Sequence, residues 1–99
     1  MLVMKFGGTS VGNAAAIATA AEHVIAARDN WPGMVVVVSA MNGVTDMLLN
    51  GAHSAAAGDG EQFQQLANDL RERHKTVIET LLTSEEERQL ASTRLDTHL

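Results

Sequence analysis

The residues best suited to chemistry form one run near the N-terminus, Lys5-Phe6-Gly7-Gly8-Thr9-Ser10-Val11-Gly12. The run ends a short apolar stretch and precedes an alanine-rich segment with helical spacing. Glycine lets backbone N–H groups approach phosphate oxygens because no Cβ intervenes. A helix N-terminus adds unpaired donors and the positive end of its dipole, and a lysine adds a mobile positive charge. We therefore expect this run to bind a phosphorylated ligand, most of all a nucleoside triphosphate.

The run matches neither of the two common phosphate-binding fingerprints. A Walker loop needs a lysine after its last glycine, where this chain has Asn13. The dinucleotide pattern needs glycines two apart, whereas Gly7 and Gly8 are adjacent. A second interpretation therefore stays open, in which the glycines only connect a strand to a helix and Lys5 is a solvated surface cation.

The whole octet carries more information than its glycines, because it closely resembles the N-terminal signature of aspartate kinases, members of the amino-acid kinase family. A second segment is similar to the Ser-Ala-x-x-x-x-Thr stretch that follows their second strand; here it reads Ser39-Ala40-Met41-Asn42-Gly43-Val44-Thr45, after a run of valines. The spacing between the two motifs also suits the family. Relatives that phosphorylate glutamate, carbamate or UMP share the lysine and glycine pair, but usually lack the Phe and the Thr-Ser continuation. The resemblance covers roughly residues 2–82.

The resemblance implies an activity. Aspartate kinases move the γ-phosphoryl group of ATP to the side-chain carboxylate of L-aspartate and form 4-phospho-L-aspartate, the first step toward lysine, threonine and methionine. A carboxylate with a pKa near ~3.9 is already ionised at neutral pH, so the reaction needs no general base. Catalysis then rests on positioning and charge neutralisation. Mg²⁺ is expected to accompany ATP through the phosphate oxygens, and no side chain is assigned to a metal.

The resemblance also assigns roles to individual residues. Lys5 is the expected catalytic residue, which contacts the transferred phosphate. Ser39 and Thr45 are placed near the aspartate substrate. For Thr9, Ser10, Ser39 and Thr45 the alternative role is helix capping, and for the first two both roles are compatible. The expected ATP-binding residues are Lys5, Phe6, Gly7, Gly8, Thr9 and Ser10.

The first part of the chain predicts a strand, a helix and a second strand. Residues 2–6 read as a strand and 13–28 as a helix, which Asn13 or the Thr9/Ser10 pair would cap. Pro32 ends the helical pattern. Residues 34–38 are continuously apolar, which is typical of a parallel strand covered on both faces. Ligands bind outside the carboxyl ends of such strands, so we expect both motifs to converge on one crevice.

The second part of the chain predicts helices. One helix runs to about residue 57 and ends at Gly58-Asp59-Gly60. Residues 61–82 carry an apolar stripe from Phe63 to Leu82, and Thr83-Ser84 reads as the cap of a last helix that runs to about residue 95.

The expected fold is α/β: the N-terminal βαβ portion of a three-layer α/β/α amino-acid kinase domain, followed by helices. Residues 1–99 would form one incomplete catalytic domain. The family's later Arg-Gly-Gly-Ser-Asp-like segment, an acidic residue of the aspartate site and the nucleotide base pocket have no counterpart here. We therefore interpret the sequence as the N-terminal piece of a longer enzyme and expect it to be inactive alone.

Composition narrows the possible partners. Seven basic and twelve acidic side chains give a net charge of −5, which argues against nucleic acid as a partner. The absence of cysteine excludes disulfides and zinc–thiolate sites. No apolar run approaches the ~20 residues that cross a bilayer, and the start does not read as a signal peptide, so we expect a cytoplasmic protein without membrane contact. Open sheet edges favour a homo-oligomer.

Two other functions remain open from the sequence. The chain would belong to another amino-acid kinase if the acceptor were glutamate or a carbamate-like anion. It would be a non-catalytic helical assembly module if the stripe from Phe63 to Leu82 were a helix-pairing surface and the glycine run only a connector.

Overall fold

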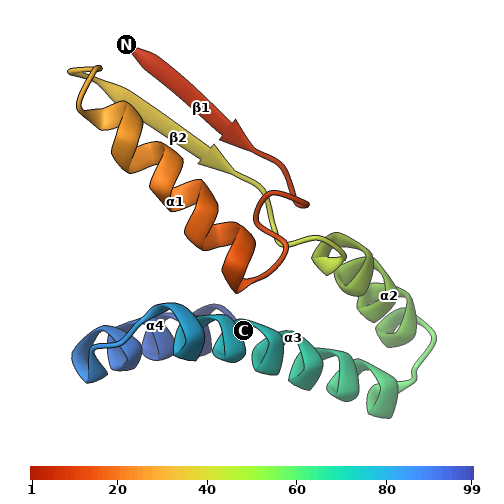
Figure 1. Cartoon of the computed structure of the whole chain (residues 1–99). Helices are drawn as coiled ribbons and strands as arrows, with labels where there is room; N and C mark the ends of the chain where they lie inside the picture. Colours follow the sequence, from red (N-terminus) through yellow and green to blue (C-terminus); the bar gives the residue numbers. More distant parts are fainter. The chain divides into compact units, whose positions relative to one another are not determined.

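The computed structural model describes all 99 residues, which form two strands and four helices (Figure 1). The chain divides into two compact units, residues 1–43 and 44–99, which are described separately below. In chain order the elements are β1 (Leu2–Phe6), α1 (Ala14–Arg28), β2 (Met34–Val38), α2 (Val44–Ala56), α3 (Gly60–Leu81) and α4 (Glu85–His98).

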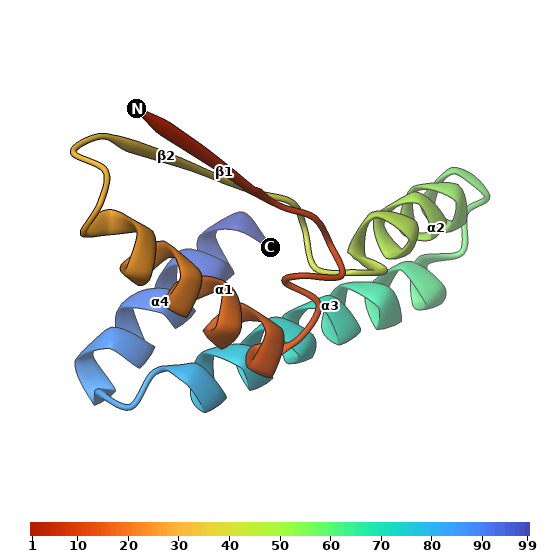
Figure 2. The same cartoon turned by 45° about the horizontal axis from the view of Figure 1, so that its top comes forward.

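The first unit is a βαβ arrangement. Strands β1 and β2 are parallel neighbours, with the register running from Leu2 opposite Met34 to Phe6 opposite Val38. Helix α1 connects them and runs back along one face of the pair (Figures 1 and 2). The predicted bounds of both strands are confirmed. The chain is thus an α/β protein in which both strands end at the same edge of the sheet.

Asn13 begins helix α1. Its backbone is extended, with φ −154°, and its side-chain oxygen accepts a hydrogen bond from the backbone N–H of Ala16 at 2.9 Å. This bond satisfies one of the free donors of the first turn, as expected for an N-cap. Of the two predicted caps, Asn13 is therefore confirmed, and the hydroxyl groups of Thr9 and Ser10 are not used for capping.

The sheet is covered less than its sequence predicts. Along β1 exposure alternates, with Leu2, Met4 and Phe6 half-buried and Val3 62% exposed. The valines of β2, Val35 to Val38, are 40–61% exposed. The prediction that β2 is covered on both faces is therefore wrong for these 99 residues. A two-stranded sheet with a single helix along it leaves the opposite face and both outer edges open.

The second unit consists of helices α2, α3 and α4. The turns that separate these helices lie where the sequence predicts them. Gly58 has φ +80°, a conformation that favours glycine, and Asp59 caps α3 by accepting a hydrogen bond from the N–H of Gln62 at 3.0 Å. Ser84 caps α4 in the same way, from the N–H of Glu87 at 3.4 Å. Helix α4 continues to His98, three residues beyond the expected end.

Helix α3 packs against both α2 and α4. Leu70 of the predicted stripe is buried, whereas Phe63 is 47% exposed. Gly51 of α2 is buried, and a Cβ added to it would lie 3.7 Å from Leu66 Cδ1, in ordinary van der Waals contact. The stripe therefore serves helix packing inside this unit. None of the helices is long and apolar enough to cross a membrane.

Candidate functional site

The two sequence motifs lie against each other at the carboxyl ends of the strands. The N–H of Ser39 donates to the carbonyl oxygen of Phe6 at 3.1 Å, which extends the strand pairing by one step. Three residues later, the N–H of Asn42 donates to the carbonyl oxygen of Gly8, again at 3.1 Å. The predicted convergence of the glycine run and the segment after β2 is therefore confirmed.

Gly8 is the position where the two loops come closest. A Cβ added to Gly8 would lie 3.3 Å from the carbonyl oxygen of Ala40 and 3.4 Å from Asn42 Cα. Both neighbours are backbone atoms, so any side chain at this position pushes the loops apart. Gly7 differs, because a Cβ there would meet nothing within 4 Å. The loop is therefore tightly held at Gly8 and open to the outside at Gly7.

The backbone of the loop keeps donors free for an anion. The N–H of Ser10 is committed to the carbonyl oxygen of Gly7 at 3.0 Å, which closes a turn. The N–H groups of Gly8 and Thr9 make no hydrogen bond within the chain. Unpaired backbone donors close to a helix N-terminus are the groups that proteins use to hold phosphate oxygens.

Lys5 is the next-to-last residue of β1 and its side chain is exposed. It forms neither an ion pair nor a hydrogen bond with another side chain, in a chain whose net charge is −5. The ammonium group is therefore available to an anionic ligand. A cation with a structural role differs, because neighbouring carboxylates or carbonyl groups accept its hydrogen bonds.

A cavity of about 500 Å³ opens beside Lys5, within the first unit. Lys5 and Phe6 line it from the end of β1. Ser10 lines it from the loop. Helix α1 contributes the remaining lining residues, Ala16, Thr19, Ala20 and His23. No carboxylate lines this cavity, which favours an anionic ligand.

The predicted substrate residues fall in different units. Ser39 follows β2, and its hydroxyl donates to the carbonyl oxygen of Ala40 at 3.0 Å, so it does not cap α2. Thr45 is the second residue of α2, is exposed, and belongs to the second unit. The structure thus places Lys5, Gly8 and Ser39 in the first unit, with the segment after Ser39 in contact with the loop at Gly8, and leaves Thr45 in the second unit.

Sequence analysis missed Thr19 and His23 as lining residues of the cavity. Their positions, together with Ala16 and Ala20, follow the spacing of one helix face. That spacing was readable in the sequence. What the sequence did not supply was the face of α1 that lines the cavity with Lys5.

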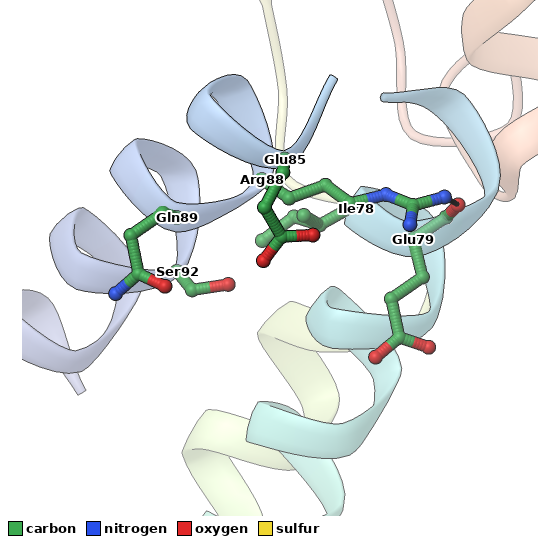
Figure 3. A pocket seen from close by; sticks show the side chains of 6 residues that line it. All are labelled: Ile78, Glu79, Glu85, Arg88, Gln89 and Ser92. Carbon is green, nitrogen blue, oxygen red and sulfur yellow. Dashed lines mark hydrogen bonds between the residues drawn. The ribbon is translucent and has the colours of Figure 1, made fainter. Parts of the chain in front are cut away.

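A second cavity, of about 370 Å³, lies between α3 and α4 in the second unit (Figure 3). It contains a cation, Arg88, whose guanidinium donates to two backbone carbonyl groups at the end of α3, those of Leu82 and, at 2.8 Å, of Glu79. Glu85 and the side chain of Glu79 also line the cavity. Arg88 thereby caps the C-terminal end of α3. No group of three or more His, Asp or Glu side chains anywhere in the chain is placed to hold a metal ion.

Sequence comparison with known proteins identifies the family of the chain. Residues 1–95 match the model of the amino acid kinase family. The chain belongs to this family. It is also similar to proteins named aspartokinases: it is 39% identical over 79 residues to bifunctional aspartokinase/homoserine dehydrogenase 1 of Arabidopsis thaliana, which is 80% of this chain and 8% of that protein.

Bacterial relatives give the same result. The chain is 50% identical over 50 residues to an aspartate kinase of Stutzerimonas stutzeri, which is 50% of this chain and 12% of that protein. It is 40% identical over 80 residues to the aspartokinase of Chlamydia muridarum, which is 81% of this chain and 16% of that protein. The resemblance to aspartate kinases is therefore confirmed. The chain spans between 8% and 16% of the length of these relatives.

Proposed function

We propose that this chain supplies the phosphate-binding portion of an aspartate kinase. The intact enzyme transfers the γ-phosphoryl group of ATP to the side-chain carboxylate of L-aspartate and forms 4-phospho-L-aspartate, on the route to lysine, threonine and methionine. The main support is the contact between the two motifs, in which the N–H of Asn42 donates to the carbonyl oxygen of Gly8. Relatives named aspartokinases or aspartate kinases add to it.

In this proposal the glycine loop binds the phosphates. The N–H groups of Gly8 and Thr9 have no partner in the chain and donate to phosphate oxygens. The hydroxyl of Ser10 and the backbone around Gly7 and Phe6 complete the contact. ATP is the phosphoryl donor, and Mg²⁺ accompanies it on the phosphate oxygens, since no carboxylate lines the cavity beside the loop.

Lys5 has the catalytic role. An aspartate carboxylate must approach a polyanion, so charge repulsion opposes the reaction. The unpaired ammonium group of Lys5 offsets this repulsion and stabilises the charge on the transferred phosphoryl group. Because Lys5 has no competing partner in the chain, its ammonium group interacts with the ligand alone.

Ser39 and Thr45 are proposed to contact aspartate. The hydroxyl proton of Ser39 is engaged with the carbonyl oxygen of Ala40, so its oxygen offers lone pairs to a ligand. Lone pairs suit the ammonium group of an amino acid better than a carboxylate. Thr45 makes no hydrogen bond through its hydroxyl and is free to donate.

The proposal includes a longer protein. The 40–61% exposed valines of β2 suit a strand that other parts of a larger sheet would cover, as in a three-layer α/β/α kinase domain. The 99 residues alone are then expected to be inactive. A cytoplasmic homo-oligomer is part of the same proposal.

The test is a trapping experiment on the intact protein. Purified protein is incubated with ATP, Mg²⁺ and L-aspartate in the presence of hydroxylamine, which converts an acyl phosphate to a hydroxamate that gives a coloured complex with Fe³⁺. We expect hydroxamate with L-aspartate, together with release of one ADP for each hydroxamate. Glutamate and carbamate are supplied in parallel as alternative acceptors. Absence of hydroxamate with aspartate, or faster ADP release with another acceptor, would overturn the proposed reaction.

A further inference from the structure

The cavity beside the glycine loop contains a histidine for which the proposed reaction has no role. His23 lines this cavity from α1, while Lys5 lines it from β1. We propose that His23 is a second phosphate-binding residue, which donates a hydrogen bond to a phosphate of ATP other than the transferred one. This inference rests on the proposed function, because it takes the ligand of the cavity to be ATP.

His23 is available for a ligand. Its side chain is exposed, and it makes no hydrogen bond or ion pair within the chain. Another histidine shows the contrast: Nδ1 of His74 is 2.7 Å from the carbonyl oxygen of Leu70, so one of its ring nitrogens is occupied. A neutral imidazole ring carries one N–H donor, and a protonated ring carries two.

The composition of the cavity favours a phosphate as its partner. The chain has twelve acidic side chains, yet none lines this cavity, and the two lining residues that can carry positive charge are Lys5 and His23. An anion that enters therefore meets attraction from two elements and repulsion from none of the lining residues. Hydrogen bonds from such donors to phosphate are stronger than those between neutral groups.

Thr19 is the other polar residue that α1 contributes, but it is a weaker candidate. Its hydroxyl donates to the carbonyl oxygen of Ala15 at 3.2 Å. The proton is thus used within the helix, and only lone pairs face a ligand, which suits a phosphate poorly. Ala16 and Ala20 are small, so they leave space above the helix between the loop and His23.

The position of His23 along α1 indicates which phosphate it binds. Helix α1 starts at Ala14, and His23 lies nine residues further, about 14 Å along the helix axis at a rise of 1.5 Å per residue. The glycine loop precedes the helix. Because Lys5 is assigned to the transferred phosphoryl group, His23 is assigned to the part of ATP that stays with the leaving group. Loss of His23 is therefore expected to weaken ATP binding and to leave the chemical step unchanged.

The test measures ATP binding and turnover in the intact protein. Calorimetry with MgATP is expected to show a dissociation constant about 10-fold to 100-fold higher for His23→Ala than for wild type, the effect of one lost hydrogen bond to a charged group. The kcat for hydroxamate formation is expected to stay within about twofold, with a raised KM for ATP. His23→Arg, which keeps a donor and a positive charge, is expected to restore the affinity.

A matched variant excludes general effects. His53→Ala makes the same chemical change on an exposed residue of α2 that lines neither the 500 Å³ nor the 370 Å³ cavity. His53→Ala is expected to bind ATP as wild type does, within about twofold. Thermal unfolding followed by circular dichroism is expected to stay close to that of wild type for His23→Ala, because the exposed His23 side chain has no hydrogen bond or ion pair to lose.

Wild-type affinity in His23→Ala overturns the inference, and so does a fall in kcat at unchanged affinity. A protein that does not bind ATP overturns it as well. The proposed reaction is judged separately, by hydroxamate formation in wild type. If ATP binding depends on His23 but no hydroxamate forms, the inference stands and the proposed acceptor chemistry falls.

Discussion

Each unit of this protein has a cavity lined by a basic side chain, but the two basic side chains are in different states. In the second unit, the guanidinium of Arg88 donates to the carbonyl groups of Leu82 and Glu79, and two glutamates line the same cavity (Figure 3). In the first unit, Lys5 has no partner, and no carboxylate lines the cavity. Arg88 therefore stabilises the fold, whereas Lys5 is free to bind a ligand.

The difference shows why a cavity with a positive charge is not by itself a binding site. The guanidinium of Arg88 donates its hydrogen bonds to the end of a helix, so removal of this side chain is expected to affect stability. The ammonium group of Lys5 has no partner in the chain, so removal of this side chain is expected to weaken the binding of an anion. The experiments below test this distinction, in order of expected effect.

Lys5→Ala is expected to have the largest effect. Loss of a group that stabilises charge in a transition state typically lowers kcat by about 10²-fold or more. Since the side chain is exposed and unpaired, the free energy of unfolding is expected to change by less than about 0.5 kcal/mol. Hydroxamate formation and thermal unfolding of the intact protein measure the two effects. Wild-type turnover in Lys5→Ala would remove this residue from the phosphate site.

Arg88→Ala is expected to show the opposite pattern. It removes two hydrogen bonds from a half-buried guanidinium to the last carbonyl groups of α3, which should lower the free energy of unfolding by about 1–2 kcal/mol. The KM for ATP should not change. Arg88→Lys keeps the charge but not the forked donors, so it should recover only part of the stability. A raised KM for ATP in either variant would break the contrast between the two cavities.

Gly8→Ala tests the contact between the two loops. The added methyl group meets the carbonyl oxygen of Ala40 at 3.3 Å, so the backbone must shift, at a cost of about 1 kcal/mol of stability. Turnover should fall as well, because the loops move apart. Gly7→Ala is the matched control: its methyl group meets nothing within 4 Å, so its unfolding should stay near that of wild type. Equal destabilisation by the two variants would contradict the described packing.

Asp96→Asn is expected to have the smallest effect. Asp96 Oδ1 lies 3.3 Å from Arg71 Nε, but the two side chains are 56% and 31% exposed. Water screens such a pair, so its loss should lower the free energy of unfolding by less than about 0.5 kcal/mol. Denaturant unfolding of the intact protein measures this. A larger loss would show that ion pairing contributes more to the second unit than its exposure indicates.

Local structure was largely predictable from the sequence. Strand and helix bounds followed from residues with strong backbone preferences, such as Pro32, Gly58 and the N-cap Asn13. The convergence of the two loops followed from a general rule about parallel strands. Both kinds of signal depend on short segments, so they need no knowledge of distant packing.

Burial and side-chain direction were less predictable. A run such as Val35 to Val38 indicates that a strand is suited to burial, but not what covers it in a given chain. The hydrogen bonds from Arg88 to the carbonyl groups at the end of α3 depend on how the chain turns between α3 and α4. The role of His23 depends on which face of α1 lines the cavity, and helical spacing alone does not select that face.

A crystal structure of the intact protein with Mg²⁺ and a non-hydrolysable ATP analogue tests the central claim most directly. We predict phosphate oxygens within hydrogen-bonding distance of the N–H groups of Gly8 and Thr9, with the ammonium group of Lys5 on the γ-phosphate. Electron density for the triphosphate away from this loop, or a Lys5 side chain directed elsewhere, would contradict the account.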